Sequence, residues 1–476
     1  MTKLRSYSDM ARPVASLSVP VLIEQAGIVL MGVINVMIAS NMGRNAISAI
    51  GMIDSINNVV ISVFGALAIG GTVVVAQQTG NGNRGEASRA AGQALLSCLA
   101  VAAVTTLLAL AFQRALVGAL FGQAEAQVLE NARVYFSVVL WSYLPIALVS
   151  IAFGVLRGSG DTRTPMAISL LMNLFNVVFS YVLIYGVRLD FAGLLLQVPA
   201  LGVRGAAVGL TAARTLGAAL AVLALLRESQ GLRVADLRNF RFDLALQKCI
   251  FRLGVPASLE QLMFNGGKLI VQTFIVGLGT VAMAATVIAG SASSLLMIPG
   301  SALSTAAVTL VGQQVGRGQP AEARRRLGFV IGIASAAMGV LSLLILPFAK
   351  NLLGLYTQDA PTLAAALPLL LTIMVAQPLL WPASFVTPAG LRGAGDVRYT
   401  MTVSIISMWV LRILLGYVFT LVFHWGILGI WLAMYTDWVG RSFFFIRRMM
   451  GDRWLKAPVF TQDPELATEI EREVRT

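Results

Sequence analysis

Two glutamates set in long apolar runs are the residues of this sequence best placed to do chemistry inside a membrane. Glu24 lies in "VPVLIEQ" (19–25) and Glu260 in "VPASLEQ" (255–261). Each lies about ten residues into its run, which at about 1.5 Å per helical residue is near mid-membrane. A charged carboxylate there costs about 2.5–3.5 kcal/mol, and burial favours the neutral form. We interpret both as candidate acids for a coupling ion, the alternative being protonated glutamates that only bond to a neighbouring helix.

A second polar group lies in "GMIDSINNVV". Asp54, Asn57 and Asn58 are spaced i, i+3 and i+4, so they share one helix face. A face this polar cannot point at lipid, so it lines either a water-accessible cavity or the interior of a helix bundle. The alternative to a functional role is a hydrogen-bond network between helices. The second repeat described below has Gly290 and Ser291 at this place, so the feature belongs to the first half only.

Cations also occur inside apolar runs. Lys268 is about 12 Å beyond Glu260 along a helix and is long enough to extend to the outer membrane interface. Arg412 has two interpretations, pairing with an acid in its own bundle or giving affinity for anions. Asp437 and Arg441 are spaced i, i+4, which predicts that they pair with each other.

The elements that must position these residues are membrane spans. The chain has 476 residues, is 57% hydrophobic and 12% charged, and has a mean hydropathy of +0.80. Soluble domains carry about 25% charged residues, so the composition indicates a membrane protein. Runs of about 20 apolar residues predict spanning helices. There are twelve: 14–39, 46–75, 90–112, 132–156, 164–187, 201–226, 250–277, 281–310, 327–348, 363–390, 400–423 and 426–446.

The loop charges predict the orientation. A cytoplasmic N-terminus places most of the 35 Lys and Arg residues on the cytoplasmic side, including Arg84, Arg89, Arg324 and Arg325. This is the positive-inside pattern, and an even number of spans then puts both termini in the cytoplasm. We expect a multi-pass protein of the cell inner membrane, embedded in the lipid bilayer. Bilayer topology also accounts for the net charge of +13 without a nucleic-acid partner.

The sequence contains an internal repeat. "VAQQTGNGNRGEASRAAG" (75–92) is echoed by "VGQQVGRGQPAEARRRLG" (311–328), and "LRGSGDTRTPM" (156–166) by "LRGAGDVRYTM" (391–401). Beyond the fifth span of each repeat, matching residues of the two halves are separated by fewer positions than in the earlier matches. This difference predicts a longer loop after the fifth span of the first half. Each repeat holds six spans, so the repeats have parallel orientations. The predicted parts are a cytoplasmic N-terminus (1–13), a first six-helix bundle (14–226), a cytoplasmic linker (227–249), a second six-helix bundle (250–447) and a cytoplasmic tail (448–476).

These motifs resemble those of the multidrug and toxic compound extrusion (MATE) family. The shared features are twelve spans in two sixes, "QQxGxG" after spans two and eight, and "LRGxGD" after spans four and ten. The resemblance covers residues 10–450. It implies an all-α polytopic membrane protein whose 12 transmembrane helices, in two parallel six-helix repeats, form a V-shaped pair of bundles. It also implies export of organic molecules by antiport with H⁺ or Na⁺.

The chain departs from this family at several acidic positions. One branch has an aspartate in span one where this chain has Asn35, and an Asn-x-x-x-Asp pair in span five where it has Asn176 and Ser180. Another branch has an acid in span ten that falls here near Trp381, and only its span-seven acid is kept, as Glu260. Glu24 is therefore interpreted as the titrating acid that replaces the missing one in the first half.

The "LRGxGD" loops are predicted to hold the cytoplasmic ends of helices. Asp161 and Asp396 are placed to cap the next helix, while Arg157 and Arg392 lie at the cytoplasmic face.

The expected activity is secondary active export of amphipathic aromatic or cationic small molecules by alternating access. The sequence contains no phosphate-binding G-x-x-x-x-G-K-[ST] loop, no HExxH motif and no cysteine-rich metal pattern. We therefore expect no cofactor other than the coupling ion, no metal, no enzymatic activity and a monomer. The alternatives are a flippase for lipid-linked oligosaccharides or other lipids, and, less favoured, a membrane-embedded enzyme.

Overall fold

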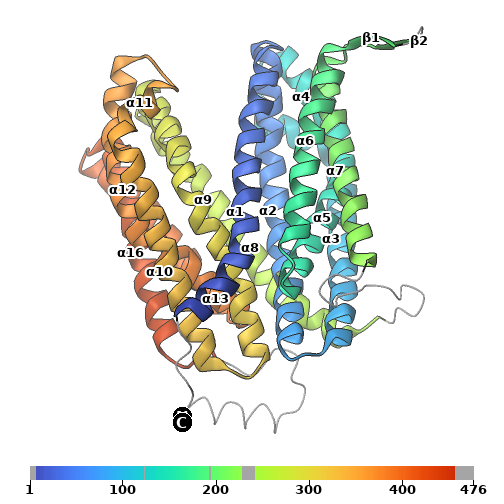
Figure 1. Cartoon of the computed structure of the whole chain (residues 1–476). Helices are drawn as coiled ribbons and strands as arrows, with labels where there is room; N and C mark the ends of the chain where they lie inside the picture. Colours follow the sequence, from blue (N-terminus) through green and yellow to red (C-terminus); the bar gives the residue numbers. More distant parts are fainter. Residues whose placement is uncertain (1–6, 123, 192–193, 228–241, 456–476) are drawn as a thin grey trace. The chain divides into compact units, whose positions relative to one another are not determined.

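The computed structural model describes residues 7–122, 124–191, 194–227 and 242–455, and these are helical almost throughout (Figure 1). Twelve helical rods run through this part of the chain. The first repeat holds α1 (Tyr7–Ser40), α2 (Arg44–Gly80), α3 (Arg84–Phe121), a rod of α4 (Ala126–Val139), η1 (Leu140–Ser142) and α5 (Tyr143–Ser159), then α6 (Arg163–Tyr185) and α7 (Gly202–Leu226).

The second repeat holds the other six rods, several of which contain short 3-10 or π-helical segments. They are α8 (Leu244–Gly277); α9 (Thr280–Gly316); α10 (Pro320–Ile345) with η3 (Leu346–Phe348) and α11 (Ala349–Gly354); α12 (Ala360–Trp381) with η4 (Pro382–Val386) and α13 (Thr387–Gly393); α14 (Val397–Ile406) with η5 (Ser407–Leu414), α15 (Leu415–Tyr417) and η6 (Val418–Val422); and α16 (Gly426–Met450). The prediction of twelve helices in two sets of six is confirmed.

Ten of the rods in the described residues are long and apolar enough to cross a membrane. The other two are α8 and α16, which are 34 and 25 residues long. They carry most of the charges that the second repeat places inside its apolar runs, among them Glu260, Lys268, Asp437 and Arg441. These charges make α8 and α16 less apolar than the other ten rods.

One short hairpin interrupts the helical pattern. Strands β1 (Val187–Phe191) and β2 (Leu194–Val198) pair antiparallel, with Val187 opposite Val198, and extend from the end of α6 (Figure 1). The equivalent connection in the second repeat, between Val422 and Gly426, has no such insertion. The predicted longer loop after the fifth span is therefore present, and it forms a β-hairpin.

The described residues form two compact units. The first-repeat unit comprises Ile23–Thr72 and Arg84–Gly254, and the second-repeat unit comprises Met1–Leu22, Val73–Asn83 and Val255–Thr476. Helices α1, α2 and α8 therefore each contribute residues to both units.

Three parts of the predicted domain organisation extend beyond the described residues. The predicted N-terminus (1–13) is described only from 7 onward. The predicted linker (227–249) is described only at 227 and from 242 onward, and the predicted tail (448–476) only as far as 455.

Close helix packing in the first-repeat unit depends on small residues. Helices α6 and α7 lie side by side (Figure 1), and glycines of α7 allow their backbones to approach. A Cβ atom on Gly205 would overlap the carbonyl oxygen of Leu183, and one on Gly209 would lie 2.8 Å from the backbone nitrogen of Ser180. Small residues let membrane helices associate through van der Waals contact where no hydrophobic effect separates helix from lipid.

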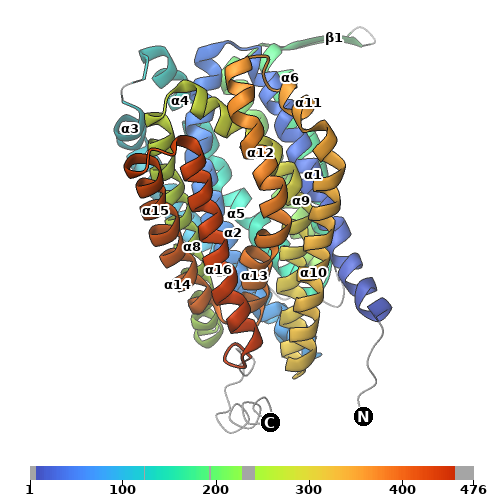
Figure 2. The ribbon, with the colours of Figure 1, turned by 90° about the vertical axis from the view of Figure 1, so that its left-hand side faces the viewer.

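In the second-repeat unit, α9 packs against α10, α12 and α13, and α16 packs against α12 and η5 (Figure 2). The rod from Ala360 to Gly393 widens into the π-helical segment η4, which begins at Pro382 and lies between Pro378 and Pro388. Proline removes a backbone donor and clashes with the preceding turn, which explains the local change of helix type.

The duplicated "QQxGxG" motifs meet within the second-repeat unit. A Cβ atom on Gly80 of α2 would overlap the carbonyl oxygen of Gln313 in α9, and one on Gly316 of α9 would overlap that of Gln77 in α2. The two contacts are equivalent, because Gln77 corresponds to Gln313 and Gly80 corresponds to Gly316. In each contact, the first glycine of one motif meets the first glutamine of the other. Only glycine permits this backbone contact.

We predict that Gly80→Ala and Gly316→Ala each lower stability by about 1–3 kcal/mol, because each methyl group forces two backbones apart. Gly332→Ala in α10 is the matched control, since a Cβ there meets nothing within 4 Å. Thermal unfolding of the purified variants in detergent measures the difference. Equal melting temperatures for all three variants would contradict the proposed backbone contact.

Candidate functional site

Glu24 forms an ion pair with an arginine of the first "LRGxGD" motif. Both carboxylate oxygens accept from Nη2 of Arg157, at 2.6 and 2.7 Å, and Glu24 is only 3% exposed. The sequence prediction treated Glu24 as a buried acid and Arg157 as a residue of the cytoplasmic face, and it did not join them. Within the first-repeat unit, the pair links α1 to the last turn of α5.

Glu260 repeats this arrangement in the second-repeat unit. Both of its oxygens lie 3.3 Å from Nη1 of Arg392, and Nη2 of Arg441 lies 4.0 Å from Oε1. Arg392 is in the last turn of α13, as Arg157 is in the last turn of α5. The pair links α8 to α13, with distances longer than those of the Glu24 pair.

Each glutamate lies beside the final turn of the helix that carries its arginine. The position of both acids near mid-membrane, which was counted from the first apolar residue, stays a prediction.

Asp54 lies in a network of neutral partners within the first-repeat unit. Its Oδ1 accepts from Nδ2 of Asn57 at 3.3 Å and from the hydroxyl of Tyr135 at 3.4 Å, and the hydroxyl of Tyr143 donates to Oδ1 of Asn57 at 2.9 Å. Arg214 is near enough to interact electrostatically with Asp54. Its Nη1 donates to Oγ of Ser142 at 2.7 Å. No ion pair to Asp54 within 4 Å is found in the described residues.

The remaining predicted residues of the first half lie apart from this network. The hydroxyl of Ser180 donates to Oδ1 of Asn176 at 3.1 Å, and both side chains are buried on α6. No hydrogen bond in the described part of the chain joins this pair to Asp54. Asn35 is half-buried on α1, and Asn58 is exposed on α2. The predicted polar face of α2 thus divides into a buried side, with Asn57, and an accessible side, with Asn58.

The second-repeat unit contains a cluster of cations. Arg412 lies 3.4 Å from Asp437, and Ser407 donates to the same carboxylate. Arg441 donates to the hydroxyl of Ser404 at 2.9 Å and lies near Glu260. The predicted ion pair between Asp437 and Arg441 was wrong, because the partners of Asp437, Ser407 and Arg412, both lie in η5.

Lys268 stands at the accessible edge of this cluster. Its Nζ lies 4.8 Å from the ring centroid of Phe264, one turn earlier on α8. The guanidinium groups of Arg412 and Arg441 lie 5.7 and 5.6 Å from the same ring. One aromatic ring therefore faces three cations, each attracted by its π electrons.

The two "LRGxGD" aspartates have different partners. Oδ1 of Asp161 accepts from the backbone nitrogens of Arg163 and Thr164, at 3.1 and 3.0 Å, so it caps α6 as predicted. Asp396 makes no such cap on α14 and instead accepts from Nε of Arg448 in α16 at 2.8 Å.

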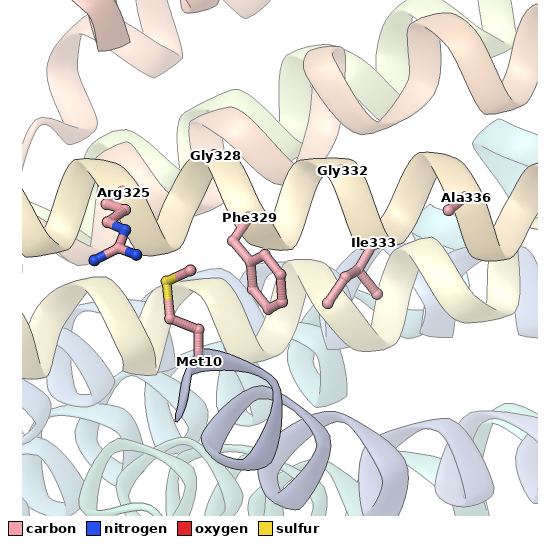
Figure 3. A pocket seen from close by; sticks show the side chains of 7 residues that line it. All are labelled: Met10, Arg325, Gly328, Phe329, Gly332, Ile333 and Ala336. Atoms are coloured by element: carbon pink, nitrogen blue, oxygen red, sulfur yellow. The ribbon is translucent and has the colours of Figure 1, made fainter. Parts of the chain in front are cut away.

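A separate cavity of about 430 Å³ lies in the second-repeat unit between the first turn of α1 and α10 (Figure 3). Met10, Phe329 and Ile333 give it apolar walls, and Arg325 lies at one end. None of the predicted site residues lines it. No group of three or more His, Cys, Asp or Glu residues able to hold a metal ion occurs in the described ranges.

Comparison with known proteins identifies the family. The family model MatE matches residues 20–182 and residues 256–418, once in each repeat. The chain belongs to the MatE family. It is a multi-pass membrane transporter, and the resemblance of its duplicated motifs to the MATE family is confirmed.

Relatives and solved structures agree with this MatE assignment. The chain is similar to the uncharacterized transporter YisQ of Bacillus subtilis (strain 168), with 28% identity over 466 residues covering 96% of this chain and 97% of YisQ. It is 26% identical to the probable multidrug resistance protein NorM of Thermotoga maritima, covering 96% of this chain and 95% of NorM. A MOP superfamily transporter from Pyrococcus furiosus has a TM-score of 0.82 at 21% identity, covering 93% of this chain and 96% of that one. This last likeness shows the fold.

Several partners of the predicted residues in this MatE chain were missed from the sequence. They are the hydroxyl groups of Tyr135 and Tyr143, and the pairing of the two glutamates with Arg157 and Arg392. A signal for the arginines existed, because Arg157 follows Glu24 by 133 residues and Arg392 follows Glu260 by 132. Because the glutamate and the arginine are separated by nearly the same number of residues in both repeats, the two residues are expected to have the same spatial relationship in each.

We predict that Glu24→Gln and Arg157→Gln each destabilise the protein by about 3–5 kcal/mol, because each leaves the opposite charge in a poorly hydrated place. The double variant loses less than the sum of the two single losses, since it leaves neither charge without its partner. Unfolding in mixed detergent micelles measures the cycle.

The exposed pair Arg324 and Asp452 provides the control for this cycle. Asp452→Asn should cost about 1 kcal/mol or less. Additive losses in the Glu24 and Arg157 cycle would show that the two charges do not stabilise each other.

Proposed function

We propose that this MatE transporter is a secondary active exporter of amphipathic aromatic or cationic small molecules, driven by an inward gradient of H⁺ or Na⁺. The observation that carries the proposal is the match of the MatE family along both repeats. Support comes from relatives named as multidrug resistance proteins, such as NorM of Thermotoga maritima and MdtK of Pectobacterium atrosepticum. The protein functions as a monomer in the cell inner membrane, with both termini in the cytoplasm, and needs no cofactor.

An ion can drive export only if it binds two conformations with different affinity. In the proposed cycle, an acid takes up H⁺ or Na⁺ when it faces outward, and this weakens its hold on a cationic substrate. The loaded protein then returns to the inward-facing state and releases the ion. The cycle thus needs an acid that a small cation can reach and neutralise.

Of the candidate acids, Asp54 suits this role best. Glu24 and Glu260 each face at least one arginine, so an incoming cation must compete with a permanent positive charge. Asp54 accepts hydrogen bonds from the neutral donors Asn57 and Tyr135 and is only partly buried. Arg214 interacts with it electrostatically but forms no ion pair with it within 4 Å in the described residues. We infer that Asp54 binds the coupling ion, with Asn57 and Asn58 on the same face, while the two glutamates hold helices together.

Transport by reconstituted vesicles tests this assignment. With ethidium as the substrate and an imposed pH or Na⁺ gradient, we expect Asp54→Asn to reduce gradient-driven accumulation by at least about tenfold, because the neutral amide cannot bind the ion. Glu24→Gln and Glu260→Gln should lower the amount of folded protein but leave its gradient dependence intact.

Asp359→Asn is the matched acid-to-amide control, since Asp359 caps α12 and asparagine caps a helix equally well. Undiminished accumulation by Asp54→Asn would contradict the assignment of the ion site. Absence of transport under either gradient in the unmodified protein would contradict antiport itself.

A further inference from the structure

The charges inside the second-repeat unit do not balance. Arg392, Arg412 and Arg441 surround the acids Glu260 and Asp437, all with side chains no more than 14% exposed. Arginine stays protonated in proteins, so this cluster has an excess positive charge even before Lys268 is counted. Nε and Nη1 of Arg441 have no hydrogen-bond partner, and no third acid pairs with these arginines in the described residues. Buried charge without a partner is costly, and an anion would relieve that cost.

This excess belongs to the second repeat only. The position equivalent to Arg412 in the first repeat is Asn176, and the position equivalent to Lys268 is Gly32. The first-repeat network around Asp54 consists largely of neutral hydroxyl and amide groups. The cations are therefore not a general requirement of the repeated fold.

The cluster has an accessible edge on α8. Gln261, Asn265, Lys268 and Gln272 recur at helical spacing and form one polar stripe, in which Lys268 and Gln272 are exposed and the other two are half-buried. None of the three amides has a hydrogen-bond partner in the described part of the chain. A polar stripe of this length cannot face lipid tails, so it faces water.

We propose that this α8 stripe binds the carboxylate of an amphipathic molecule with an apolar aromatic body. Lys268 supplies the charge, and Asn265 and Gln272 supply hydrogen-bond donors. Arg412, whose guanidinium lies 5.7 Å from the centroid of the same Phe264 ring, adds a positive field. The same field repels a molecule that carries only a cation. The inference rests on the proposed function for its role in transport, because it makes carboxylate-bearing amphiphiles one class of exported substrate.

Equilibrium binding to the purified full-length protein tests the site without any gradient. The probe is 2-naphthoate, and 2-naphthylmethylammonium is a cation of similar shape; calorimetry measures both. We expect saturable binding of the naphthoate that weakens as salt rises, and no saturable binding of the ammonium probe. Lys268→Gln should weaken naphthoate binding at least about tenfold, since it removes a charged donor from an exposed position.

Two control variants test whether Lys268→Gln changes naphthoate binding directly. Lys350→Gln removes another exposed lysine, on α11, and should leave binding unchanged. Lys268→Arg keeps the charge and should restore binding. A melting temperature for Lys268→Gln like that of the unmodified protein establishes that the variant folds.

Three outcomes would overturn the proposal. They are equal binding of the two naphthalene probes, naphthoate affinity unaffected by Lys268→Gln, and stabilisation by chloride without any binding of naphthoate. The last outcome would assign the excess charge to an inorganic counter-ion. These results differ from failure of the proposed antiport, which removes gradient-driven transport but leaves naphthoate binding in place.

Discussion

The ion pair between an apolar-run glutamate and the arginine of "LRGxGD" is the constraint on which the arrangement of each repeat depends. Glu24 with Arg157, and Glu260 with Arg392, join the first helix of a repeat to the end of its fourth rod. Neither charge is stable alone in a poorly hydrated place, so each fixes the position of the other. The glycine that follows the arginine's helix then directs the chain into the next helix, with φ of 101° at Gly160 and 91° at Gly395.

Much of this arrangement was predictable because the two halves of the sequence repeat the same motifs. The repeat, the twelve helices, the twin glutamates and the long loop before α7 all follow from periodicity and similarity along the chain. The pairing partners were not predicted, because contacts between residues more than a hundred positions apart leave no local pattern. Only the similar separation of glutamate and arginine in the two repeats indicated them. Asp437 shows the same limit, since the i, i+4 rule selected Arg441 while the packing of α16 against η5 selected Arg412.

The two repeats share a backbone plan but differ in the chemistry they enclose. The first-repeat unit surrounds Asp54 with hydroxyl and amide groups, whereas the second-repeat unit groups arginines around Glu260 and Asp437. Duplication provides the same helix positions. Substitutions at those positions give the first repeat an acid with no ion pair within 4 Å in the described residues, and the second repeat a cluster with excess cations. This division gives a physical basis for assigning ion binding to one repeat and anion recognition to the other.

The central claim is that the glutamates are structural and that Asp54 is the acid that takes up the ion. Infrared difference spectroscopy of the purified protein, titrated from neutral to acidic pH, tests it directly, because a carboxyl group absorbs differently once protonated. We expect a protonated-carboxyl band that is lost in Asp54→Asn and persists in Glu24→Gln and Glu260→Gln. A band that persists in Asp54→Asn and is lost in either glutamate variant would contradict the account.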